Sequence, residues 1–315
     1  MQIPHAKRPR TGWGKHVRPN LFIVGAPKCG TTAWVEYLGS HPRIFFSKAK
    51  EPHHFSHDFP KWCWARTQQE YLALFQESGD APVVGEGSVR YLYSRVAARE
   101  IHKFNPAAKI LIFLRSQEDF LPSLHNQQLY NRDEAIENFE QVWRLSGNRS
   151  ADTIPACCRE PSFLDYKAMG RFREQVERFF AVFPAEQIRV LAFRDWIADP
   201  RQTYLDILDF LGLEDDGRTE FPPVNEAKHH KSRIVASLTQ NPAPWVRKTS
   251  TLVTQIAGKQ LGILTRLRSL NRGTGYRSAP IEPSLKQEIR EYYEAENLAL
   301  LPLVSWRRAG EQTRL

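Results

Sequence analysis

The chain has 315 residues, of which 41% are hydrophobic and 25% are charged, so it can bury a large core without disulfides or metals. This composition excludes collagen, coiled coils and wholesale disorder. No apolar run approaches the roughly 20 residues that cross a bilayer, and the first residues lack the apolar stretch of a secretory signal. The four cysteines form neither a CxxC pair nor a zinc-binding spacing. We therefore expect a reduced, cytoplasmic protein without a structural metal ion.

The net charge is +9, and two segments without acidic residues supply more than this, so the rest of the chain is net negative. Residues 1–18 hold five lysines or arginines and are predicted to be a flexible basic tail. Residues 227–281 hold ten, and within them residues 243–275 mix basic and aliphatic residues as a basic amphipathic helix does. This segment could dock peripherally on a membrane, cover an acidic acceptor, or pack on the core with a solvated edge. Both segments favour anionic partners.

Short apolar runs alternate with segments of helical periodicity along residues 19–212. The apolar runs predict buried strands at 21–24, 44–46, 82–85, 109–114 and 187–193. The periodic segments predict helices at 31–39, 67–77, 94–104, 120–130, 163–183 and 200–211, with irregular stretches at 47–66 and 131–162. This alternation is typical of an α/β fold with a doubly wound, mainly parallel sheet flanked by helices. We expect residues 19–315 to form a single domain.

A P-loop-like phosphate-binding loop is predicted at residues 25–32 (GAPKCGTT), between the first strand and the first helix. Glycines let backbone N–H groups approach a phosphate, and the helix N-terminus adds positive potential. Lys28 adds a full charge, and Thr31 adds a hydroxyl donor. The two glycines have the spacing of a Walker A motif, but Thr31 stands where its lysine should be. A P-loop nucleotide kinase or nucleoside triphosphatase is therefore an alternative that the sequence disfavours.

This loop resembles the 5′-phosphosulfate loop of sulfotransferases that use 3′-phosphoadenylyl sulfate (PAPS). Their second hallmark is an arginine at the end of a later strand with a serine eight residues on, and Arg115 and Ser123 match it. A forked guanidinium and a hydroxyl suit the terminal 3′-phosphate that this pair holds in the family. The resemblance implies PAPS as co-substrate, released as adenosine 3′,5′-bisphosphate. The implied nucleotide-binding residues are Gly25, Lys28, Cys29, Gly30, Thr31, Thr32, Arg115, Ser123 and, by a weaker match to a later loop of the family, Lys231 and Arg233.

A further segment narrows the resemblance to carbohydrate sulfotransferases of the heparan-sulfate type. Residues 50–55 (KEPHHF) are similar to the stretch in which a glutamate is the proposed general base of that group, which implies Glu51 as the base. His53 is the rival, because small-molecule sulfotransferases use a histidine and imidazole titrates near neutral pH. We expect burial in the loop to raise the pKa of Glu51 towards neutrality.

Residues 85–92 (GEGSVRYL) also match that group, whose stretch reads GEKTPxYL. The match departs at Gly87, which replaces a lysine that helps to hold the phosphosulfate or the substrate. Arg90 is the candidate to compensate for the missing charge. The implied substrate residues are Glu86, Arg90 and His54.

The resemblance implies sulfuryl transfer by in-line displacement, with Lys28 stabilising the bridging oxygen as charge develops on it. No metal ion is required for this step. The acceptor is not specified: it could be a hydroxyl or amine of a carbohydrate, a glycolipid or a small molecule. A basic nucleic-acid-binding protein is a further alternative, but no nucleic-acid-binding module is recognisable, and we expect no nucleic-acid partner.

Overall fold

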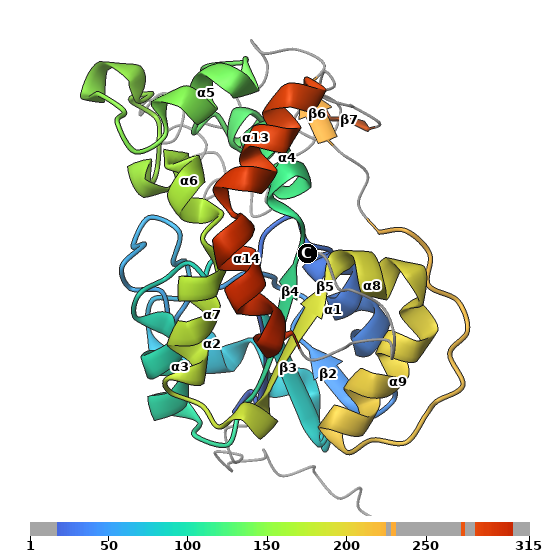
Figure 1. Ribbon diagram of the computed structural model, residues 1–315. Helices are drawn as coiled ribbons and strands as arrows, with labels where there is room; N and C mark the ends of the chain where they lie inside the picture. Colours follow the sequence, from blue (N-terminus) through green and yellow to red (C-terminus); the bar gives the residue numbers. More distant parts are fainter. Residues whose placement is uncertain (1–17, 225–227, 231–271, 275–280, 305–315) are drawn as a thin grey trace, which may run out of the picture.

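Five parallel strands form the central sheet in the order β2-β3-β1-β4-β5 (Figure 1). The computed structural model describes residues 18–224, 228–230, 272–274 and 281–304. The strands are β1 (Leu21–Gly25), β2 (Ile44–Phe46), β3 (Val83–Gly87), β4 (Lys109–Leu114) and β5 (Ile188–Ala192). Because β1 lies between β3 and β4, the strand order reverses beside it, and ligands of doubly wound sheets bind at such a switch point. The predicted fold class is confirmed.

Helices cover both faces of this sheet. In Figure 1, α1 (Thr31–Gly39), α8 (Phe193–Ala198) and α9 (Pro200–Leu211) lie on one side of it. On the other side lie α2 (Gln68–Ala73), α3 (Ala97–Phe104) and α7 (Phe172–Phe180). Every residue of β1 is buried, and the indole of Trp34 on α1 stacks on the ring of Phe113 on β4 with centroids 5.5 Å apart. Packing against the apolar strands therefore holds the start of α1 next to the end of β1.

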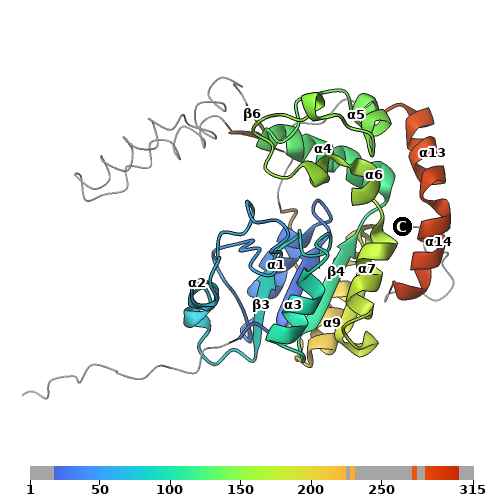
Figure 2. The ribbon, with the colours of Figure 1, turned by 90° about the vertical axis from the view of Figure 1, so that its left-hand side faces the viewer.

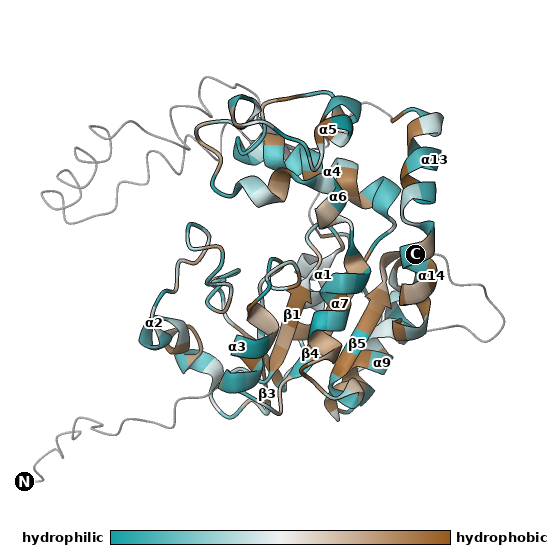
Figure 3. Ribbon diagram, turned by 60° about the vertical axis from the view of Figure 1, so that its left-hand side comes forward, coloured by the Kyte–Doolittle hydropathy of each residue, from teal (hydrophilic) through white to brown (hydrophobic). Residues whose placement is uncertain are grey.

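A second group of helices stands above the carboxyl ends of the strands (Figure 2). It comprises α4 (Gln117–Asn131), α5 (Phe139–Leu145), α6 (Tyr166–Met169) and α13 (Pro283–Tyr292). From α13, the chain continues into α14 (Glu294–Leu300), which lies beside α7 at the level of the sheet. The side-chain amides of Gln117 and Asn297 exchange hydrogen bonds of 2.8 and 2.9 Å, and the indole of Trp143 donates to Glu288 at 2.9 Å. These contacts join residues 281–304 to the main body of the chain. Figure 3 shows the apolar strands of the sheet below α4, α5 and α6.

Short elements complete the described chain. They are the 3₁₀ turns η1 (Gln76–Ser78), η2 (Ala151–Thr153), η3 (Pro161–Leu164), η4 (Ala185–Gln187) and η5 (Leu301–Leu303), and the antiparallel pair β6 (Lys228–His230) and β7 (Arg272–Thr274). No helix within the described ranges is both long and apolar enough to cross a membrane. The predicted tail 1–18, except Arg18, and the segment 243–275, except β7, lie outside the described residues.

One predicted helix is wrong. Residues 163–183 do not form one helix but are divided into the end of η3, then α6 and then α7. The Asp165 carboxylate caps α6 by accepting from the Ala168 N–H at 3.1 Å, and α6 ends at Gly170. A Cβ on Gly170 would lie 2.4 Å from the hydroxyl of Tyr293, so the docking of α14 requires glycine at this break. The predicted irregular stretch 131–162 also contains α5, and α8 was not predicted.

Candidate active site

The predicted phosphate loop lies between the end of β1 and the start of α1, as the sequence indicates. Gly30 precedes α1 in the left-handed conformation with φ of 83°, and Lys28 is also left-handed with φ of 64°. A Cβ on Gly30 would lie 2.2 Å from the indole of Trp196, so glycine is required both by conformation and by packing. The first N–H groups of α1 have no partner within the helix and point towards the loop, where an anion can accept from them.

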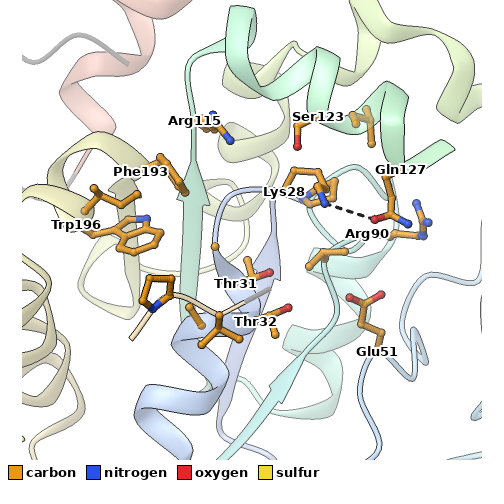
Figure 4. A pocket seen from close by; sticks show the side chains of 18 of the residues that line it. Lys28, Thr31, Thr32, Glu51, Arg90, Arg115, Ser123, Gln127, Phe193 and Trp196 are labelled. Carbon is orange, nitrogen blue, oxygen red and sulfur yellow. Dashed lines mark hydrogen bonds between the residues drawn. The ribbon is translucent and has the colours of Figure 1, made fainter. Parts of the chain in front are cut away.

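A pocket of about 780 Å³ opens above this loop (Figure 4). The charged residues of its described lining are three cations, Lys28, Arg90 and Arg115, and one carboxylate, Glu51. Other lining residues, which come from the start of α1, the loop before α2, α4, α8 and the chain after α9, are Thr31, Thr32, Trp62, Ser123, Gln127, Gln128, Asn131, Phe193, Trp196, Ile197 and Phe221. The excess of positive charge suits a ligand with several negative groups.

Arg115 and Ser123 come together at one side of the pocket. Arg115 follows β4 directly, and its guanidinium lies 4.7 Å from the ring centroid of Phe193. Its Nη2 lies 3.8 Å from Asp119, while its buried Nε has no hydrogen-bond partner in the part of the chain that the structure describes. A phosphate can accept from this forked group and from the Ser123 hydroxyl. The two residues that the sequence pairs therefore face the same space (Figure 4).

Lys28 connects the loop to α4. Its Nζ lies 3.5 Å from Oε1 of Gln127, whose amide nitrogen donates to Asn131 at 3.0 Å (Figure 4). Gln127 is four residues beyond Ser123, so both lie on the face of α4 that covers the pocket. The ammonium group is thus held in the middle of the pocket, between Arg115 at one end and Glu51 at the other.

Glu51 and His53 form a hydrogen-bonded pair at the other end of the pocket. His53 Nε2 lies 3.3 Å from Glu51 Oε2. The His53 side chain is only 2% exposed, whereas the Glu51 side chain is 41% exposed and lines the pocket. The histidine tautomer with its proton on Nε2 donates to the carboxylate. Of the two rival bases, Glu51 is therefore the one that a ligand in the pocket can reach.

The expectation that burial raises the pKa of Glu51 is wrong. Burial does act in that direction, but the hydrogen bond from His53 and the positive charges of Arg90 and Lys50 outweigh it and lower the pKa below its usual value. Burial lowers the pKa of His53 in spite of the neighbouring carboxylate. At neutral pH the pair is therefore a carboxylate that accepts from a neutral imidazole.

The loop that carries this pair has an uncommon backbone. Glu51 and His53 both have positive φ, at 54° and 53°. Left-handed conformations cost non-glycine residues about 1 kcal/mol or more and persist where surrounding contacts hold them. Trp64 Nε1 donates to the Glu51 carbonyl at 2.8 Å, and the His53 N–H donates to Ser88 Oγ at 3.1 Å. Two side chains outside residues 50–55 thus fix the direction of the carboxylate.

Besides Gly25 and His53, three residues predicted to contact ligands lie outside the described pocket lining. Glu86 is buried beneath it, where it accepts from the Tyr71 hydroxyl at 3.4 Å, and burial raises its pKa to about 7. His54 stacks on Tyr71 with centroids 4.5 Å apart, and its Nδ1 contacts the Ala65 carbonyl at 2.7 Å. The Cys29 side chain is buried, and burial raises the pKa of its thiol to about 12, so only its backbone remains available to a phosphate. Lys231 and Arg233 lie outside the described residues.

Among the pocket-lining residues that sequence reasoning missed are Trp62, Gln127, Phe193 and Trp196. Two of them carried a usable signal, because Phe193 and Trp196 follow directly on β5, and strand ends of a parallel sheet meet at one edge. The helical spacing of Gln127 from Ser123 was a second signal. Trp62 carried none, because it lies in an irregular loop and reaches the pocket only through the tertiary fold.

The fold and this pocket define an α/β protein with a P-loop-like turn whose geometry suits phosphate groups. Residues 18–222 match the model of the family described as "Sulfotransferase domain". The chain belongs to that family.

Two curated relatives and one solved structure extend this result. Human heparan sulfate glucosamine 3-O-sulfotransferase 6 is 25% identical over 204 residues, which cover 65% of this chain and 55% of that protein. Mouse carbohydrate sulfotransferase 15 is 25% identical over 266 residues, covering 64% and 45% of the two chains. The chain thus spans about half the length of the curated relatives it matches. A crystal structure of a sulfotransferase from Alicyclobacillus acidocaldarius superposes with a TM-score of 0.58 at 28% identity, covering 79% of this chain and 99% of that one.

Proposed function

We propose that this protein transfers the sulfuryl group of PAPS to a hydroxyl or amine of a carbohydrate acceptor. The observation that carries the proposal is the order of groups along one pocket: Arg115, the phosphate loop with Lys28, and then Glu51. A nucleotide bisphosphate needs the first two, and an acceptor that loses a proton needs the third. Family membership and the two carbohydrate-modifying relatives support the same activity. Glycolipids and small molecules are the other acceptor classes.

The proposed step is a displacement at sulfur. The acceptor oxygen or nitrogen forms a bond to sulfur as the bond from sulfur to the bridging oxygen of the 5′-phosphate breaks. The acceptor proton passes to the Glu51 carboxylate, and adenosine 3′,5′-bisphosphate leaves with the electron pair of the broken bond. Lys28 stabilises the charge that grows on the bridging oxygen, and the step needs no metal ion.

Other residues of the pocket bind and orient the nucleotide in this proposal. Thr31, Thr32 and the N–H groups at the start of α1 hold the 5′-phosphate. Arg115 and Ser123 hold the 3′-phosphate, and the buried, unpartnered Nε of Arg115 fits this role because a phosphate oxygen would satisfy it. His53 positions Glu51, because its own ring is almost completely covered. We further propose a cytoplasmic protein, with residues 243–275 as a candidate peripheral membrane contact.

Calorimetric titration with adenosine 3′,5′-bisphosphate, in the absence of magnesium and with ATP as the comparison, tests the proposal. We expect tight binding of the bisphosphate that is lost in folded Lys28→Ala and Arg115→Ala variants. Glu51→Gln is the matched variant for the other end of the pocket, and it should keep nucleotide binding while losing sulfuryl transfer. If ATP bound only when the titration was repeated with magnesium, and the bisphosphate did not bind at all, the protein would instead be a nucleotide kinase or triphosphatase.

A further inference from the structure

Arg90 holds a buried guanidinium in the wall of the pocket, packed against two aromatic rings. Its Cζ lies 3.4 Å from the ring centroid of Trp62 and 4.5 Å from that of Phe163, and the residue is 7% exposed. The contact with Trp62 covers a face of the guanidinium, and the N–H groups at its edge remain the part that donates hydrogen bonds. The N–H groups of this edge can donate two parallel hydrogen bonds, a geometry that suits a carboxylate or a sulfate.

A second arginine, Arg159, also lies against the Trp62 ring, but Arg90 and Arg159 differ in their carboxylate partners. Arg159 lies 3.5 Å from the same ring, but it has a carboxylate of its own, since its Nη2 and Nε donate to Asp133 at 2.6 and 3.1 Å. Among the described residues, Arg90 has no carboxylate oxygen within 4.0 Å, and its buried Nε has no hydrogen-bond partner. Burying an ion without a partner is costly, so such groups usually serve a ligand.

The neighbour that most favours the charge of Arg90 is the proposed base. Burial lowers the pKa of Arg90 to about 10, and the Glu51 carboxylate opposes this shift more than any other group. The guanidinium is still protonated at neutral pH. During transfer, however, Glu51 takes up a proton and loses its charge. Asp133 and Glu160, whose effect on Arg90 is smaller, then remain as its counter-charges, and an anion on the acceptor would take the place of Glu51.

We propose that Arg90 binds an anionic group of the acceptor, a carboxylate or a sulfate close to the hydroxyl or amine that reacts. Figure 4 shows Arg90 and Glu51 at the end of the pocket opposite Phe193 and Trp196, with Lys28 between the two ends. Nucleotide phosphates occupy the Lys28 and Arg115 side in the proposed function, on which this inference rests. The Glu51 and Arg90 side is therefore left for the acceptor, which we assign to the class of acidic saccharides.

The test compares matched oligosaccharides in the presence of saturating adenosine 3′,5′-bisphosphate, which fills the phosphate sites. The probes are a chondroitin hexasaccharide, its neutral carboxyl-reduced form, and a carboxyl-reduced form that carries 4-O-sulfate. Calorimetry gives the dissociation constant of each probe for the wild-type chain and for Arg90→Gln, Arg90→Lys and Lys103→Gln. The last variant removes the same charge from an exposed side chain of α3.

We expect the wild-type chain to bind at least one acidic probe about tenfold or more tightly than the neutral one. The carboxylate and sulfate probes separate the two kinds of anion. Arg90→Gln should remove the preference, Arg90→Lys should keep part of it, and Lys103→Gln should keep all of it. Bisphosphate affinity should be the same in all four proteins.

The inference is overturned if the wild-type chain binds the acidic and neutral probes equally, or binds none of them, whether or not the Arg90 variants fold. It is also overturned if folded Arg90→Gln retains the preference. Failure of the wild-type chain to bind the bisphosphate is a separate result, because it removes the proposed function rather than the role of Arg90 alone.

Discussion

The indole N–H of Trp64 donates a hydrogen bond of 2.8 Å to the carbonyl oxygen of Glu51, and the backbone N–H of Trp64 donates to the Pro52 carbonyl at 3.2 Å. Trp64 is 48% exposed, so burial of its ring does not explain a tryptophan here. The contacts hold Glu51 at its positive φ, with its carboxylate towards the pocket. Trp64 is therefore a positioning residue for the proposed base.

Trp64→Phe keeps an aromatic ring but removes the hydrogen bond to Glu51. We expect the release of bisphosphate from PAPS to slow roughly ten- to hundredfold, because a small misplacement of a catalytic group has effects of that size. Calorimetric affinity for the bisphosphate should not change. Trp143→Phe is the matched control, since it removes an indole hydrogen bond to Glu288 far from the pocket. Equal slowing in both variants would show a general loss of stability instead of a positioning role.

His53→Phe should move the acid limb of the pH–rate profile to higher pH. The carboxylate form of Glu51 acts as base, so activity is present above the Glu51 pKa and is lost as the pH falls through it. The hydrogen bond from His53 helps to lower that pKa, and burial acting alone raises it. The wild-type limb should accordingly lie below the usual glutamate pKa.

The pH dependence of bisphosphate release from PAPS measures this limb. His54→Phe is the control, because His54 contacts the Ala65 carbonyl and not Glu51. An unshifted limb in His53→Phe would contradict the role assigned to the pair. If His53→Phe abolished release at every pH while Glu51→Gln retained it, His53 would be the base.

Arg115→Met should weaken the binding of one nucleotide much more than that of another. Affinity for adenosine 3′,5′-bisphosphate should fall about 10- to 100-fold, since a hydrogen bond to a charged group contributes about 1.5–3 kcal/mol. Affinity for adenosine 5′-monophosphate, which lacks the 3′-phosphate, should stay nearly constant. Arg99→Met on the exposed surface of α3 controls for the loss of one charge. A similar loss for both nucleotides would place Arg115 elsewhere on the ligand.

Much of the sheet and the phosphate loop could be predicted because local sequence determines them. The run 21–24 is apolar at every position, which is typical of a strand covered on both faces, and β1 begins and ends within one residue of that run. Gly25 and Gly30 mark the turn, and a strand followed by glycines and a helix is a local pattern. Arg115 could be found for the same reason, because it directly follows an apolar strand.

The acceptor side of the pocket could not be predicted to the same extent. The direction of Glu51 depends on Trp64 and on the hydroxyl of Ser88 beneath His53, which are contacts between separate segments. The pKa of Glu51 was predicted in the wrong direction because burial was considered without its hydrogen-bonded partner. The contacts of Arg90 with Trp62 and Phe163 join three separate segments of the chain, and periodicity contains no information about such contacts.

Glu86 gives the wild-type protein a dependence of stability on pH that Glu86→Gln should remove. Burial raises the pKa of this carboxyl from 4.5 to about 7 in the folded state. Between these values the unfolded chain releases its proton while the folded chain retains it, so the free energy of unfolding falls as the pH rises. The loss is complete above about pH 7 and is on the order of 3 kcal/mol.

Glutamine keeps a donor and an acceptor beside Tyr71 but cannot ionise. The variant should gain stability relative to the wild type as the pH is raised from 4.5 to 8, as measured by urea unfolding at several pH values. Glu77→Gln, which changes a side chain that is 73% exposed, is the solvent-exposed control. A constant difference between Glu86→Gln and wild type across this range would mean that Glu86 ionises alike in the folded and unfolded chains. Glu86 would then be a carboxylate at neutral pH, and the Tyr71 hydroxyl would donate to it.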